Sequence, residues 1–121
     1  MNRYLTVILA IAALVVLVYI LNPTILGLFL GNQPSKYDDF AKCLGPKAVM
    51  YGSETCPHCK NQKALFGSSF KYINYVECGA NPQACTNANV RSIPMWVIGN
   101  TSLIGEQTLT KLSAESGCPL A

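Results

Sequence analysis

The stretch Thr55-Cys56-Pro57-His58-Cys59 decides the fold, because it lies where a short apolar run gives way to a helical pattern. The run Ala48–Tyr51 is typical of a buried strand, and Pro57–Phe66 is typical of a helix with a proline near its start. Cys56 is therefore expected at a helix N-terminus, where unpaired backbone N–H groups stabilise an anion. Cys59 would lie one turn further along on the same side, within reach of a disulfide.

Two cysteines at this spacing, in a strand–turn–helix context, are typical of thiol–disulfide exchange. We expect Cys56 to be the stabilised outer thiolate and Cys59 to resolve the mixed disulfide. A haem attachment site would need histidine after the second cysteine, where this chain has Lys60, and a zinc ribbon would need a second C-x-x-C. A zinc site and a purely structural disulfide remain the alternatives.

His58, between the two cysteines, is expected to influence the reactivity of the pair. A positive or hydrogen-bonding imidazole near the Cys56 sulfur would stabilise the reduced thiolate and make the disulfide the stronger oxidant. The alternative is an ordinary solvent-exposed helix residue.

The order of the remaining elements predicts an α/β fold. Gly99-Asn100 is a two-residue turn typical of a hairpin, and a strand–helix–strand start implies a right-handed crossover between parallel strands. A mixed central sheet flanked by helices follows from this order. The expected helices are Lys36–Leu44, Asn81–Asn89 and Glu106–Ser116, and the further strands are Lys71–Glu77, Pro94–Ile98 and Ser102–Ile104.

The N-terminal segment predicts a membrane anchor. Leu5–Leu21 is apolar apart from Thr6, and no charged residue occurs between Arg3 and Lys36. A helix needs about 20 apolar residues to cross a bilayer. A cleaved signal peptide, whose apolar core is about 7–15 residues long, is the alternative.

We therefore expect one transmembrane helix before a single domain. The positive charges of the N-terminus and Arg3 lie closer to the apolar run than those of Lys36 and Lys42, which favours a cytoplasmic N-terminus and an extracytoplasmic domain. The expected division of the chain is an anchor over residues 1–30, a linker over 31–35 and a domain over 36–121.

Composition excludes two classes of protein. Beyond residue 30 the chain has eight Lys/Arg and six Asp/Glu, since Arg3 is the only charged residue before Lys36. So small a net charge excludes a strongly electrostatic nucleic-acid binder. Half of all residues are hydrophobic, which excludes a disordered chain.

Several stretches resemble the thioredoxin-fold family, and more narrowly the thioredoxin-like domain associated with vitamin K epoxide reductase homologues. Together they cover about residues 47–118. They are Met50-Tyr51-Gly52, Cys56 through Lys63, Phe66-Gly67, Asn74 through Cys78, Cys85, Ile93 through Gly99, Gly105-Glu106-Gln107 and Ser116-Gly117.

The resemblance implies a membrane-anchored thiol–disulfide oxidoreductase that donates disulfides to cysteine-containing proteins outside the cytoplasm. A quinone-linked membrane partner of the vitamin K epoxide reductase type would reoxidise it, and the chain itself would need no metal or organic cofactor. Cys56 would be the nucleophile, Cys59 the resolving cysteine and Pro94 a cis-proline packed against them. A trans proline opening an edge strand is the alternative for Pro94.

Two departures from the resemblance affect the expected activity. A single anchor stands where those homologues have the reductase domain, so the quinone-linked partner is expected to be a separate protein. Ordinary thioredoxins have a buried acid six residues before the first cysteine, where this chain has Met50, and a tryptophan where it has Thr55. The missing acid argues against efficient reductase activity, although Glu54 lies near as an exposed residue.

The other four cysteines are expected to form disulfides, as an even number does in an oxidising compartment. The family has a disulfide in the region of Cys78 and Cys85, and Cys43–Cys118 would then join the first helix of the domain to the C-terminus. The alternative is that one pair is a second redox relay. Two other functions remain open: an anchored reductase or isomerase of the same fold, for instance in cytochrome maturation, and a non-enzymatic metal-binding module.

Overall fold

The computed structural model describes residues 2–24, 27 and 34–120. The chain forms two compact units, Met1–Pro34 and Ser35–Ala121. Residues 31–33 of the predicted linker lie outside the described residues, as do residues 1, 25, 26 and 28–30 of the predicted anchor.

Helix α1 makes up most of the described part of the first unit. It spans Arg3–Ile20, and its 18 residues extend about 27 Å at ~1.5 Å per residue. Its mean hydropathy is 2.4, and none of its side chains is buried. By length and composition α1 can cross a membrane, although a signal sequence near the N-terminus meets the same criterion.

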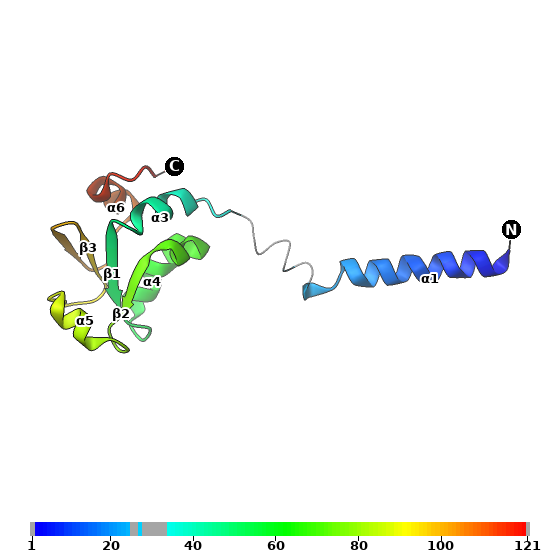
Figure 1. The fold of residues 1–121 in the computed structure, drawn as a ribbon, viewed down its shortest axis with the longest axis horizontal. Helices are drawn as coiled ribbons and strands as arrows, with labels where there is room; N and C mark the ends of the chain where they lie inside the picture. The colour runs from blue at the N-terminus through cyan, green and yellow to red at the C-terminus, as the bar shows by residue number, and fades with distance from the viewer. Residues whose placement is uncertain (1, 25–26, 28–33, 121) are drawn as a thin grey trace. The chain divides into compact units, whose positions relative to one another are not determined.

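The second unit is a four-stranded mixed sheet with helices packed on it (Figure 1). The strand order is β2-β1-β3-β4, with β1 parallel to β2 and antiparallel to β3, and β3 antiparallel to β4. This arrangement is a thioredoxin-like fold. The elements are α3 (Asp38–Leu44), β1 (Ala48–Gly52), α4 (Pro57–Phe66), the 3₁₀ helix η1 (Gly67–Tyr72), β2 (Asn74–Glu77), α5 (Pro82–Asn87), β3 (Met95–Ile98), β4 (Thr101–Ile104) and α6 (Leu109–Ser116).

One aromatic cluster forms the centre of the core. Phe66, at the end of α4, stacks on Phe40 of α3 with ring centroids 6.0 Å apart, and its centroid is 5.9 Å from that of Trp96 on β3. Trp96 lies directly opposite Met50 of β1 in the sheet, and both are fully buried. The helix that carries the two cysteines is therefore fixed against the middle of the sheet.

The predicted strand Lys71–Glu77 is wrong in its first half, because the chain forms η1 before β2 begins. The hydroxyl of Ser69 in η1 donates a 2.8 Å hydrogen bond to the buried Asp38 carboxylate of α3. The ring of Phe70 packs edge-on against Phe66. These tertiary contacts favour a tight helical turn where the local alternation of side chains indicated a strand.

The predicted start of the last helix at Glu106 is also wrong, since α6 begins at Leu109. The Thr108 side chain accepts the backbone N–H of Lys111 at 3.1 Å and caps the helix there. Just before it, the backbone N–H of Gln107 donates to the buried Gln62 side chain at 2.6 Å, and the Gln62 amide donates to the Gln107 carbonyl at 3.0 Å. This pairing ties the segment before α6 to α4.

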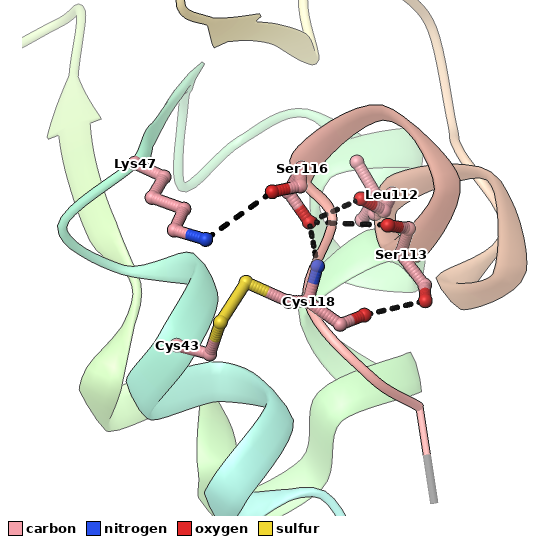
Figure 2. Close-up of a disulfide and its surroundings, with 6 residues drawn as sticks. All are labelled: Cys43, Lys47, Leu112, Ser113, Ser116 and Cys118. Atoms are coloured by element: carbon pink, nitrogen blue, oxygen red, sulfur yellow. Dashed lines mark hydrogen bonds between the residues drawn. A yellow bond between two sulfur atoms is a disulfide. The ribbon is translucent and has the colours of Figure 1, made fainter.

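Two disulfides staple the second unit, and they are the pairs expected from the sequence. Figure 2 shows Cys43 of α3 joined to Cys118, just beyond α6, beside a Ser116 hydroxyl that accepts the Cys118 N–H at 3.2 Å. The second disulfide joins Cys78, after β2, to Cys85 of α5. The sequence separations are 75 and 7 residues respectively.

The unequal loop lengths predict unequal effects on stability. In the loop-entropy model, a closure of 75 residues contributes about 4.5 kcal/mol and one of seven residues about 2.4 kcal/mol. Replacing Cys43 and Cys118 together with alanine should therefore lower the free energy of unfolding about twice as much as replacing Cys78 and Cys85. Urea denaturation of the full chain in detergent measures both, and equal losses would contradict the model.

Candidate active site

The two cysteines lie where β1 turns into α4. Cys56 is the N-cap residue, with extended backbone angles of φ −83° and ψ 118°, and Pro57 follows at the first helical position. The Cys56 sulfur accepts the backbone N–H of Cys59 at 3.2 Å. A sulfur thus takes the place that a serine or aspartate oxygen usually holds at a helix start, and it faces the positive end of the helix.

Cys56 and Cys59 are the free cysteines of the described chain, and they differ in exposure. Cys56 is half-buried, whereas Cys59 has no exposed surface. Burial, with a hydrogen bond to the Cys56 thiol, raises the pKa of Cys59 to about 11. The pair therefore consists of an accessible sulfur and an inner thiol that is protonated at neutral pH.

Pro94 brings a second segment to the outer sulfur. The Ile93–Pro94 peptide bond is cis, and Pro94 is fully buried. The Ile93 carbonyl oxygen lies 3.9 Å from the Cys56 sulfur, within range of a weak S–H···O contact. The Pro94 carbonyl accepts the N–H of Gly105 at 2.8 Å, which ties the strand start to the end of β4.

The structure places His58 beside a carboxylate that sequence analysis missed. Its Nδ1 lies 2.6 Å from Glu106 Oε1, and the Asn61 amide donates to the same oxygen at 3.1 Å. The His58 side chain is thus hydrogen-bonded to Glu106 and not to Cys56, and it is 73% exposed. The hydrogen bonds from His58 and Asn61 hold the pKa of Glu106 below its usual value.

A second missed group lies on the inner side of the motif. The Lys63 ammonium of α4 is ion-paired with Glu54 and lies 3.9 Å from the ring centroid of Tyr75 on β2. Burial is the largest single effect and works to lower the pKa of Lys63, but its hydrogen bond to Glu54 and its interactions with Tyr75 together outweigh burial and raise that pKa. No local pattern in the sequence indicated this cluster, because its members come from a loop, a helix and a strand.

The position six residues before Cys56 holds no carboxylate. Met50 is fully buried in the core, opposite Trp96. Glu54, which lies closer in sequence, is 66% exposed. Within residues 2–24, 27 and 34–120, no group of three or more His, Cys, Asp or Glu side chains is arranged to hold a metal ion.

No family model matches the chain. It is 37% identical over 82 residues to the thiol-disulfide oxidoreductase LTO1 of Arabidopsis thaliana, and the match covers 60% of this chain and 22% of that protein. The chain therefore spans about a fifth of the length of this curated relative.

Solved structures similar to the chain include thioredoxins and a glutaredoxin. Oxidised thioredoxin from Plasmodium falciparum has a TM-score of 0.47 at 16% identity, covering 68% of this chain and 90% of that one. Malassezia sympodialis thioredoxin has a TM-score of 0.47 at 20% identity, with coverages of 70% and 87%. A glutaredoxin from Archaeoglobus fulgidus has a TM-score of 0.40 at 21% identity, with coverages of 56% and 83%.

The difference between the two thiols predicts their alkylation. With a pKa of about 11, only about one Cys59 thiol in a thousand is ionised at pH 8. Iodoacetamide should therefore modify Cys56 first in the reduced, folded chain, and the rate at Cys59 should rise about tenfold per pH unit toward pH 11. Peptide mass mapping measures both sites, with the unfolded protein as control. Equal rates at pH 8 in the folded protein would contradict the assignment.

The environment of Glu106 predicts a second titration. Replacing His58 with alanine should raise the pKa of Glu106 toward its ordinary value, because the largest stabilising hydrogen bond is lost. Asn61→Ala should raise it less. In the wild type the lowered pKa means that these contacts add stability above the ordinary carboxylate pKa and lose it as pH falls through the lowered value. NMR titration of the Glu106 carboxyl carbon measures the shift, and an unchanged pKa in His58→Ala would refute the contact in solution.

Proposed function

We propose that this chain is a thiol–disulfide oxidoreductase that donates disulfides to cysteine-containing proteins outside the cytoplasm. The main support is the geometry of the two free cysteines. Cys56 is accessible at a helix N-cap and accepts the N–H of Cys59, while Cys59 is buried one turn behind it. The similarity to a relative named as a thiol-disulfide oxidoreductase supports the same class of reaction.

In the proposed reaction a substrate thiolate attacks the Cys56 sulfur of the Cys56–Cys59 disulfide. The bond between the two cysteines breaks, and Cys59 leaves with the electron pair and takes up a proton. A second substrate thiolate then attacks the substrate sulfur of the mixed disulfide, and Cys56 leaves as a thiolate. The substrate loses two electrons and two protons: this chain gains both electrons and one proton, on Cys59, and the other proton goes to solvent while Cys56 is a thiolate. The N–H of Cys59 and the start of α4 stabilise the Cys56 thiolate as it leaves.

The proposal includes a membrane location. Helix α1 is long and apolar enough to anchor the chain, with the N-terminus in the cytoplasm and the domain outside it. The disulfides Cys43–Cys118 and Cys78–Cys85 fit an oxidising compartment. A quinone-linked membrane protein of the vitamin K epoxide reductase type would reoxidise the Cys56–Cys59 pair, and the anchor would raise the effective concentration of the two proteins for each other.

The direction of the reaction is tested by the reduction potential of the Cys56–Cys59 pair. A disulfide donor should have a potential nearer to about −120 mV than to about −270 mV, the value of a reducing thioredoxin. Equilibration with a glutathione redox buffer, with the two forms separated after acid quenching, measures it. A value at the thioredoxin end would favour the anchored reductase or isomerase instead.

The substrates and the membrane partner are identified by trapping. In Cys59→Ala, mixed disulfides through Cys56 should accumulate in cells, because the resolving thiol is missing. The matched control is Cys56→Ala, which removes the accessible sulfur and should trap nothing. Mass spectrometry of the adducts should find a quinone-linked membrane protein and extracytoplasmic substrates. Absence of adducts specific to Cys59→Ala would reject the exchange mechanism.

A further inference from the structure

The hydroxyl of Tyr75 is a buried polar group without a hydrogen-bond partner among the described residues. Tyr75 belongs to β2 and is paired in register with Met50 of β1, in the middle of the parallel strands. A buried hydroxyl is normally hydrogen-bonded, because it has lost its contact with water. The Tyr75 hydroxyl is therefore available to donate to an acceptor within its reach.

Gly52, the last residue of β1, brings this hydroxyl close to the inner sulfur. A methyl group placed on Gly52 would lie 3.0 Å from the Cys59 sulfur and 3.2 Å from the Tyr75 hydroxyl oxygen. A single methyl group at Gly52 would therefore contact both the Cys59 sulfur and the Tyr75 hydroxyl. Because Gly52 has no side chain, none of its atoms separates these two groups. Any larger residue at this position would separate the sulfur from the hydroxyl.

Lys63 lies against the ring of Tyr75. Its ammonium lies 3.9 Å from the ring centroid, and its pairing with Glu54 fixes it there. Burial raises the pKa of Tyr75, and the charge of Lys63 works in the opposite direction. The same charge also favours the ionised form of Cys59, against the effect of burial. Lys63 is thus placed to promote negative charge on the sulfur and proton donation by the hydroxyl.

The proposed reaction places a negative charge on the buried Cys59 sulfur. When a substrate attacks Cys56, Cys59 must leave as a thiolate in a fully buried place. A thiol with a pKa of about 11 is a poor leaving group unless its charge is met as it forms. A buried carboxylate could take part in this proton transfer, but Met50 occupies the position where thioredoxins have one.

We propose that the Tyr75 hydroxyl is the group that meets this charge, by donating a hydrogen bond and then its proton to the Cys59 sulfur. This inference rests on the proposed disulfide exchange. As the Cys56–Cys59 bond breaks, Cys59 keeps the electron pair and takes the Tyr75 proton. The phenolate regains a proton from the Lys63 ammonium, and Lys63 regains one from water. In the reverse direction Lys63 first loses a proton to water and takes the Tyr75 proton, and the phenolate then removes the proton from Cys59 before Cys59 attacks a mixed disulfide.

The test is the resolving step in a single turnover. Cys56 is first converted to its mixed disulfide with glutathione, and the release of glutathione by Cys59 is followed in the full chain across pH. Tyr75→Phe should slow this release about 10- to 100-fold at neutral pH, the effect expected for one hydrogen bond to a charged group. The matched control is Tyr72→Phe, another half-buried tyrosine, which lies between Lys42 and Lys71 and should leave the rate unchanged.

Two further variants keep the test decisive if Tyr75→Phe fails to fold. Lys63→Met should slow the release and move the pH profile to higher pH, and Lys63→Arg should restore much of the rate. Gly52→Ala should slow the release by separating the sulfur from the hydroxyl. The titratable groups to consider in the profile are Cys56, Glu54, Lys63 and Tyr75, all of which interact with Cys59 or with one another. Formation of the Cys43–Cys118 and Cys78–Cys85 disulfides and the melting temperature show whether each variant is folded.

The outcomes separate this inference from the proposed function. The role of Tyr75 is supported if folded Tyr75→Phe releases glutathione more slowly than the wild type, or if both Gly52→Ala and Lys63→Met do so. An unchanged rate and pH profile in folded Tyr75→Phe overturns it and leaves the exchange activity standing. A wild-type protein that releases no glutathione at all would instead contradict the proposed function.

Discussion

The packing of one face of α4 against the sheet is the constraint from which the site follows. Phe66 anchors the helix between Phe40 and Trp96. Cys59 and Gln62 lie seven and four residues earlier, so helical periodicity places them on the same buried face. The burial of the inner thiol is therefore a consequence of how α4 is held. Cys56, the N-cap residue at the start of the helix, packs against the core only in part and remains accessible.

The two sulfurs also differ in the polar groups that lie near them. On the outer side, Glu106 binds both His58 and Asn61 and keeps the imidazole engaged away from Cys56. On the inner side, Lys63 and Tyr75 lie behind Cys59. The two carboxylates involved, Glu54 and Glu106, are both on loops and both substantially exposed, so neither introduces a negative charge into the core. The charge of Lys63 and the backbone N–H of Ser53 consequently favour the ionised form of Cys59, against the effect of burial.

The order and type of the domain's elements were predictable from local patterns, because short apolar runs bounded by turn residues are strong local indicators. The bounds of α4 match the prediction, since Pro57 starts the helix and Gly67, at φ 56°, ends it. The turn Gly99-Asn100 likewise joins two antiparallel strands. The errors fall at η1 and at the start of α6, where long-range hydrogen bonds to Asp38 and Gln62 override the local pattern.

The sequence by itself determined that two cysteines, three residues apart, stand at the junction of a strand and a helix, because the proline and the apolar periodicity around them are local features. Only the tertiary structure decided which groups surround those cysteines. Glu106 reaches His58 across 48 residues, and Tyr75 approaches Cys59 from β2 because Gly52 has no side chain to keep them apart. Such contacts depend on the register of strands and the seating of a helix, which no local pattern encodes.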